Sequence, residues 1–76
     1  MYNRLRALVA QRADRERRRI TLKEVSERTG VSRYTVHAMA NYTLREYPGD
    51  ALDALCAYLE CGIGDLLVVE RKEGIL

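Results

Sequence analysis

The sequence lacks several features that other classes of protein need. None of the 76 residues is Trp or Phe, and only one is Pro, one is His and two are Cys. No run approaches the ~20 apolar residues of a membrane span. The opening Met1-Tyr2-Asn3-Arg4 lacks the apolar centre of a secretion signal. We therefore expect a cytoplasmic protein that has no membrane partner.

The single histidine and the two cysteines give little support to metal binding or catalysis. The spacing of Cys56 and Cys61 matches no zinc motif, redox pair or disulfide framework, so we interpret them as packed, reduced thiols. His37 has no thiol or carboxylate near it in a catalytic pattern. Three aspartates are better explained by helix termini or solvent: Asp50, Asp53 and Asp65. The sequence predicts no enzyme, no metal and no cofactor.

The residues that are present indicate one small globular domain, residues 1–76, with a core between residues 5 and 67. Apolar residues make up 47% of the chain and charged residues 32%. The charge is unevenly distributed, since residues 1–45 hold 11 basic and 4 acidic side chains, which gives +7, whereas residues 46–76 hold 2 and 7, which gives −5. This polarity favours a face that attracts polyanions, although an uneven solvated surface is an alternative explanation.

Two capped helices follow one another closely in the middle of the chain. Thr21-Leu-Lys-Glu24 is a capping box, in which the side chains of Thr21 and Glu24 each bond the other's backbone N–H. The helix that it begins should run over 22–29 and end at Gly30, which readily adopts the left-handed conformation. Ser32 is a good cap for a third helix over 33–41. Residues 21–41 therefore predict a helix-turn-helix.

The predicted third helix has one apolar side and one polar side. At 100° per residue Val36, Met39 and Ala40 fall together and should face the core. The opposite side gathers hydrogen-bond donors, an aromatic ring and a small residue: Tyr34, His37, Ala38 and Asn41, with Arg33 in the first turn. An ordinary solvated helix face is the plain alternative, but the neighbouring capped helix favours a binding surface.

Helical spacing also predicts the remaining elements. A first helix begins near Leu5 and extends toward the stretch Arg12 to Arg19. Pro48 suits the first position of a fourth helix with an apolar stripe of Ala51, Leu52, Leu55, Cys56 and Leu59. A short fifth helix is expected over 63–67, and the β-branched residues near Val69 indicate a strand before the polar tail.

Two segments carry a resemblance to a known family. Thr21-Leu-Lys-Glu-Val-Ser-Glu-Arg-Thr-Gly-Val-Ser-Arg-Tyr-Thr-Val36 resembles the helix-turn-helix of lambda-repressor and Cro-like (XRE-type) regulators. Residues 52–67 resemble the fourth and fifth helices of its small single-domain bacterial branch. The resemblance implies an all-α, five-helix domain in which a strand at residues 2–4 pairs with one at 67–69, within a C-terminal strand or tail over 67–76.

The same resemblance implies a set of DNA contacts. The base-facing residues of the recognition helix would be Ser32, Arg33, Tyr34, Thr35, His37 and Ala38. Phosphate contacts would come from Thr21, Leu22 through its backbone N–H, Lys23, Asn41, Thr43 and Arg45. An arginine at the start of such a helix is suited to the two acceptors of guanine, and Ala38 to a thymine methyl group.

The chain departs from the family pattern at several positions. Leu22 stands where a glutamine is common, Ala40 replaces a glutamate that usually pairs with an arginine on the first helix, and Tyr42 stands where glycine is frequent. The first helix and its loop are also longer than usual. Their additional arginines either reach flanking phosphates or form a solvated helix end, the reading we favour: Arg15, Arg17, Arg18 and Arg19.

Two functions from different classes are consistent with these observations. The first is a transcriptional regulator that binds double-stranded DNA with helix 33–41 in the major groove, as a homodimer on a palindromic operator. Its dimer seam would use residues 67–69, Ile75-Leu76 or the last two helices. The second is a protein-interaction module, adaptor or antitoxin-like, with an aromatic contact patch: Tyr34, Tyr42, Leu44 and Tyr47.

Overall fold

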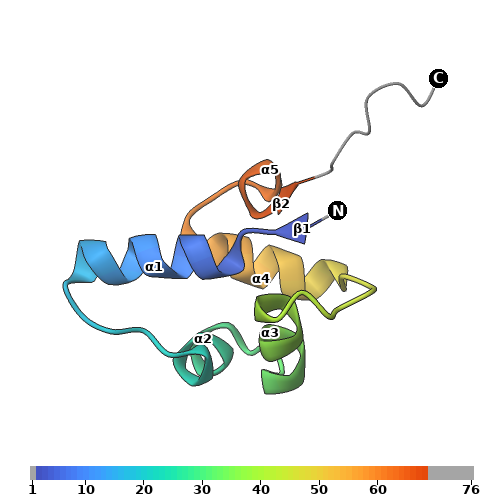
Figure 1. The fold of residues 1–76 in the computed structure, drawn as a ribbon, viewed down its shortest axis with the longest axis horizontal. Coiled ribbons are helices and arrows are strands. Elements are labelled where there is room, and N and C mark those ends of the chain that lie inside the picture. Colours follow the sequence, from blue (N-terminus) through green and yellow to red (C-terminus); the bar gives the residue numbers. More distant parts are fainter. Residues whose placement is uncertain (1, 69–76) are drawn as a thin grey trace.

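The computed structural model describes residues 2–68, and these form five helices and one short strand pair (Figure 1). The elements in chain order are β1 (Tyr2–Asn3), α1 (Leu5–Glu16), α2 (Leu22–Thr29), α3 (Arg33–Ala40), α4 (Gly49–Leu59), α5 (Ile63–Leu66) and β2 (Leu67–Val68). Helices α2 and α3 lie on one side of the α1 and α4 pair, and the strand pair with α5 lies on the other. The predicted mainly helical fold is confirmed.

The strand pair joins the beginning of the chain to the end of α5. β1 and β2 are antiparallel, with Tyr2 opposite Val68 and Asn3 opposite Leu67. The backbone N–H of Arg4 extends this pairing by donating to the carbonyl oxygen of Leu66 at 2.8 Å. The predicted pairing is therefore confirmed for the described residues, whereas Val69 and the predicted tail to residue 76 lie outside them.

Both predicted caps of the helix-turn-helix are present, but one capping box is incomplete. The side-chain oxygens of Thr21 and Ser32 accept from the backbone N–H of Glu24 and Thr35, each at 3.1 Å. The reciprocal bond, in which the Thr21 N–H would donate to the Glu24 carboxylate, was wrongly predicted. The Glu24 carboxylate instead binds Arg18, since a bidentate bond to a guanidinium is stronger than one to a neutral amide.

Helices α1, α3 and α4 end in the same backbone arrangement. In each, a left-handed residue follows the helix and the next N–H bonds a carbonyl five residues back, which is the Schellman motif. The left-handed residues are Arg17, Tyr42 and Glu60, with φ between 54° and 60°. Only α2 uses the expected glycine, Gly30, at φ 77°. An L side chain makes this conformation costly, so these three ends are stabilised by their hydrogen bonds and packing.

Several predicted boundaries shift slightly. α1 stops at Glu16, before the end of the arginine-rich stretch. α3 ends at Ala40 and α5 at Leu66, one residue earlier than predicted. Pro48 is the flanking cap residue of α4 rather than its first helical residue, with ψ at 131°. An extended ψ places a residue before a helix rather than inside it.

The core lies where α1, α2, α3 and α4 meet and includes all the residues predicted to face it from α3. Leu5, Val25, Val36, Met39 and Leu55 have no exposed surface. The predicted α4 stripe is confirmed, because its residues are buried or pack against this core. Burying apolar surface supplies ~25 cal/mol per Å², which makes this cluster the main source of stability.

Both cysteines are free and half-buried, in agreement with packed, reduced thiols. Burial raises the pKa of the Cys61 thiol, and the neighbouring Cys56 adds to the shift. Within residues 2–68 no group of three or more His, Cys, Asp or Glu side chains is arranged to hold a metal ion. No helix of the described part is long and apolar enough to cross a membrane.

Candidate nucleic-acid interface

The first turns of α3 present polar side chains to solvent. Arg33, Tyr34 and His37 are all exposed, with Tyr34 at 78% of its maximum. Ser32 is exposed as well, but its hydroxyl donates to the Thr35 Oγ1 at 2.9 Å while accepting the cap bond. Arg33, Tyr34 and His37 therefore have polar groups available for a ligand, whereas Ser32 and Thr35 mainly hold the turn.

Ala38 was wrongly predicted to belong to this exposed face. It is only 8% exposed, because the chain after α3 turns back over it. The backbone N–H and the hydroxyl of Thr43 both donate to the Ala38 carbonyl oxygen, at 2.9 and 3.3 Å. These two residues occupy the paired positions of the Schellman motif, so the backbone at Thr43 lies over the last turn of α3. A methyl group covered in this way has little surface left to meet a base.

A second set of predicted residues lies at the N-terminus of α2. The amide groups of its first turn have no carbonyl partner within the helix, and the helix dipole makes this end positive. Lys23 is exposed, and Leu22 is half-buried and packs against the core. The position that commonly holds glutamine therefore contributes packing here, and its backbone amide is the group left for a phosphate. Thr21 is exposed, with its side-chain oxygen used for capping.

A basic groove of about 410 Å³ connects these two sets. We use this name for the hollow lined by Arg6, Arg19, Ile20, Thr21, Leu22, Lys23, Arg33 and His37. Its cations come from α1, the α1–α2 loop, α2 and α3, and no acidic side chain of residues 2–68 lines it. Such a concentration of positive charge on one concave surface raises the local concentration of anions.

The C-terminus of α3 is held by α1. The Arg6 Nε donates to the Ala40 carbonyl oxygen at 2.8 Å, and its Nη2 donates to the Asn41 Oδ1 at 3.3 Å. A cation at this end of a helix interacts favourably with the dipole and with the free carbonyls. This contact explains how the domain accommodates alanine at position 40, since the arginine binds the backbone where a glutamate is usual. It also fixes the side chain of Asn41.

The loop after α3 points Arg45 away from the basic groove. Arg45 lines a second hollow, of about 470 Å³, which we call the tyrosine groove. Its lining is otherwise aromatic and apolar: Tyr2, Tyr42, Leu44, Tyr47, Leu52 and Leu67. Three residues of the predicted aromatic patch therefore lie together, but Tyr34 is not among them. The predicted phosphate contacts fall at two separate places, on either side of α3.

A comparison with protein families identifies the family of this domain. The family model of the Cro/C1-type HTH DNA-binding domain matches residues 15–72. The chain belongs to this family. The predicted resemblance to Cro-like regulators is thereby confirmed. A comparison with curated proteins and another with solved structures each gave no match.

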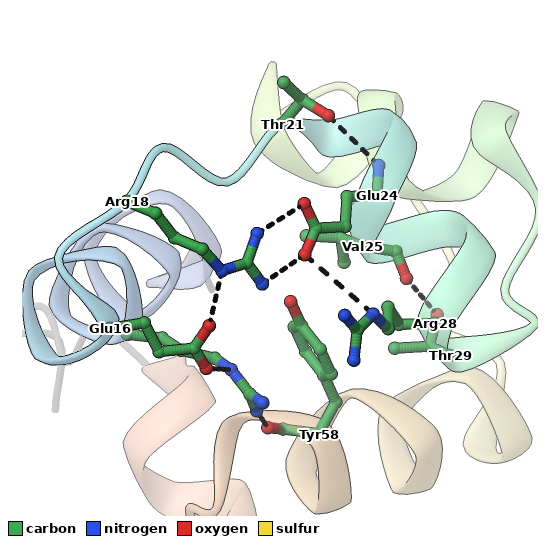
Figure 2. Close-up of polar contacts among 9 residues, drawn as sticks. Glu16, Arg18, Thr21, Glu24, Val25, Arg28, Thr29 and Tyr58 are labelled. Carbon is green, nitrogen blue, oxygen red and sulfur yellow. Dashed lines mark hydrogen bonds and ion pairs between the residues drawn. The ribbon is translucent and has the colours of Figure 1, made fainter.

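The loop between α1 and α2 is joined to both helices by side-chain hydrogen bonds. Figure 2 shows the Arg18 side chain between two carboxylates, Glu16 at the end of α1 and Glu24 in α2. Its Nε donates to the Glu16 Oε1 at 2.8 Å, and its Nη1 and Nη2 donate to the Glu24 Oε1 and Oε2 at 2.9 and 2.5 Å. We call these three residues the Arg18 bridge. The favoured reading of a solvated helix end is thus wrong for Arg18.

Arg12 links the same cluster to α4. Its Nε donates to the Glu16 Oε2 at 2.7 Å, and its Nη1 donates to the carbonyl oxygen of Tyr58. The Arg12 guanidinium also lies 4.1 Å from the centre of the Tyr58 ring, within the range of a cation–π interaction. The arginine-rich stretch therefore contains two arginines that bind carboxylates or backbone, Arg12 and the exposed Arg18.

Arg12 and Arg18 lower the pKa values of the two glutamates. The hydrogen bond from Arg12 is the main cause that lowers the pKa of Glu16, and the hydrogen bonds from Arg18 lower the pKa of Glu24 below its ordinary value. Both carboxylates thus stay charged to lower pH than in an unfolded chain. The sequence did not indicate this pairing, because residues six apart across a loop follow no helical spacing.

Asn3 is a further residue whose role the sequence did not reveal. It is 2% exposed, and its side chain accepts from the Leu5 N–H at 3.1 Å and donates to the Met39 carbonyl oxygen at 2.9 Å. One side chain thus binds the first amide of α1 and the last turn of α3. A buried amide with satisfied hydrogen bonds fixes the relative position of the elements that it joins.

Proposed function

We propose that this domain is a sequence-specific regulator of transcription that inserts α3 into the major groove of double-stranded DNA. The observation that carries the proposal is the basic groove beside the exposed first turns of α3. Phosphates supply most of the salt-dependent affinity of such proteins, and base edges supply the specificity. Here the cations that suit phosphates adjoin the side chains that suit bases.

Each exposed residue has a distinct role in this proposal. Arg33 reads a guanine through its O6 and N7 acceptors, which discriminates by ~1–3 kcal/mol when both bonds form. Tyr34 and His37 reach a base edge or a phosphate. The α2 amide groups and Lys23 bind one stretch of backbone, while Asn41, Thr43 and Arg45 bind another. Ala38 supports the helix from inside and is left out of the contact surface.

We further propose that the regulator binds as a homodimer on a palindromic operator. One short recognition helix reads only a few base pairs, and two-fold symmetry doubles the site. The side of α5 and β2 is the proposed seam, since Ile63 is 52% exposed and Leu67 and Val68 are half-buried. We expect sedimentation at high micromolar concentration to show a dimer. A protein that stays monomeric there would contradict this dimer interface in the absence of DNA.

Selection of bound sequences from a random duplex pool tests the proposal most directly. We expect enrichment of a short motif, repeated with inverted symmetry and with half-sites separated by about one helical turn. Enrichment of a single motif without symmetry would support a DNA-binding regulator but contradict the proposed dimer. A pool without enrichment, together with no binding to duplex at low salt, would reject the proposed DNA-binding function.

The tyrosine groove favours a second candidate, a protein-interaction module on the same scaffold. Aromatic residues are enriched in protein interfaces, and Tyr42 is 60% exposed beside the groove. Under this candidate the partner buries Tyr42, Leu44 and Tyr47, and α3 remains uncovered. Titration with random duplex separates the two functions, because a module of this kind would show no salt-dependent binding to DNA.

A further inference from the structure

The loop between α1 and α2 carries an arginine that the proposed DNA contacts do not include. Arg19 lines the basic groove together with Lys23 and Arg33. Within residues 2–68 it forms no ion pair and no side-chain hydrogen bond. Arg18, the residue just before it, has all three guanidinium nitrogens bound to carboxylates. Adjacent arginines in one loop thus have different environments.

The backbone around Arg19 is fixed on both sides. Before it, the Arg18 bridge ties the loop to the end of α1 and to the first turn of α2. After it, Ile20 packs against the core and Thr21 caps α2. Arg19 and Ile20 both line the groove, and the packing of Ile20 against the core holds the backbone next to Arg19 in place.

The bridge also compensates the negative charge of a carboxylate that follows a groove residue in the sequence. Glu24 stands in the first turn of α2, one residue after Lys23. Arg18 holds the Glu24 carboxylate in a bidentate pair, and Arg28 lies 3.9 Å from its Oε2. Both arginines thereby compensate the carboxylate, and among residues 2–68 no acidic side chain lines the groove. Both effects of the bridge favour an anion beside Arg19.

We infer that Arg19 is an additional contact to a DNA backbone phosphate and that Arg18 is the positioning residue that holds it there. This inference rests on the proposed function and extends its phosphate surface beyond the helix-turn-helix, onto the α1–α2 loop. The contact lies next to the α2 N-terminus, so it adds a flanking phosphate on that side of the recognition helix. It contributes affinity without base preference.

Titration of the full chain with a random duplex over a range of salt concentrations tests the contact. Each phosphate that a protein neutralises contributes ~0.9 to the slope of log K against log salt. We expect Arg19→Ala to reduce the slope by ~0.9 and the affinity at ~0.1 M salt by roughly 5–10-fold. Arg19→Lys should retain the wild-type slope, since an ammonium also binds phosphate.

Arg15→Ala is the matched control for the loss of one positive charge. Arg15 is exposed on α1 and lines a different hollow, with Glu60 and Asp65, away from the basic groove. We expect Arg15→Ala to keep the wild-type slope of log K against log salt. Equal slopes for Arg15→Ala and Arg19→Ala, in a protein that still binds duplex, would overturn the contact and leave the proposed function intact. No binding by the wild type at low salt would instead reject the proposed function, and the inference with it.

Glu24→Gln tests the positioning role, because a model based on net charge and a model based on positioning predict opposite effects on DNA binding. Removing a negative charge near DNA should strengthen binding if only net charge matters. If the bridge positions Arg19, the same change weakens binding and reduces the slope by the amount seen for Arg19→Ala, with no further loss in the double variant. Tighter binding by Glu24→Gln would overturn the positioning role.

Arg18→Lys provides a second test that does not alter net charge. A lysine cannot reproduce the planar fork that binds both Glu24 oxygens, so we expect it to reduce the slope as Glu24→Gln does. Circular dichroism at the titration temperature shows whether each variant is folded. Folded Arg18→Lys protein with the wild-type slope would show that the bridge stabilises the fold without positioning Arg19.

Discussion

The carbonyl oxygen of Ala38 accepts two hydrogen bonds from Thr43, one from the backbone N–H at 2.9 Å and one from the hydroxyl at 3.3 Å. This relationship turns the chain back over α3 and buries the alanine. It requires Tyr42, which lies between them, to adopt a φ of 60°. The loop that carries Arg45 thus leaves α3 through a conformation that glycine would adopt without strain.

Tyr42→Gly should therefore stabilise the domain. The left-handed conformation costs an L residue ~1–2 kcal/mol, and the extra freedom of glycine in the unfolded chain offsets ~0.5–1 kcal/mol of that. We expect a net gain of roughly 0.5–1 kcal/mol in the free energy of unfolding, measured by urea denaturation. Tyr42→Ala, which retains the strain, serves as the control and should show no gain.

Arg33→Ala should remove base discrimination. On the selected operator we expect a loss of ~1–3 kcal/mol in binding free energy, with a much smaller loss on random duplex. Fluorescence anisotropy with both duplexes at one salt concentration measures the difference. Equal losses on the two duplexes would assign Arg33 to the phosphates and not to a base.

Arg45→Ala should behave in the opposite way. Because Arg45 lies on the tyrosine groove side of α3, away from the base-facing turns, we expect similar weakening on operator and random duplex. The salt slope should fall by ~0.9 on each. Unchanged DNA binding, combined with loss of a protein partner, would support the interaction module.

Low pH should weaken the ion pair between Arg18 and Glu24, which joins the α1–α2 loop to α2. The pKa of Glu24 is lower in the folded domain than the ordinary value of 4.5, mainly through the Arg18 hydrogen bonds. The folded state thus binds the Glu24 proton less readily than the unfolded state, so its contribution is present above pH 4.5 and is lost as the pH falls through the folded pKa.

Thermal melts from pH 6 to pH 2.5 measure this loss, with Glu24→Gln as the control. The variant should be less stable than the wild type at pH 6, and the difference should shrink as the wild-type carboxylate is protonated. Parallel curves at all pH values would show that the Arg18 bridge does not contribute to stability.

Tyr58→Phe should be neutral or stabilising. The Tyr58 hydroxyl is buried, and within the described part of the chain it has no hydrogen-bond partner, whereas its ring carries the Arg12 interaction. Removing an unsatisfied buried hydroxyl while retaining the ring avoids a desolvation cost of ~1–3 kcal/mol. Urea denaturation should show a midpoint at or above the wild-type value, and a clear loss would mean that the hydroxyl is hydrogen-bonded in solution.

Local rules were sufficient for the helix-turn-helix. Thr21, Gly30 and Ser32 each act through backbone atoms within a few residues, so their effects are visible in the sequence. The apolar spacing of Val36 and Met39 likewise predicted their burial. The prediction failed for Ala38, because helical periodicity does not include the chain that follows the helix end.

The contacts that complete the candidate site join residues that no helical or strand spacing pairs. Arg6 binds the end of α3, and Arg18 binds Glu24 across a loop. Neither pairing follows a local pattern, since each depends on the angle at which α1 crosses the other helices. The amino-acid sequence alone determined the helices, their caps and the excess of positive charge in residues 1–45. Only the tertiary structure decided which arginines neutralise carboxylates and which face the basic groove, because an ion pair depends on distances that folding sets.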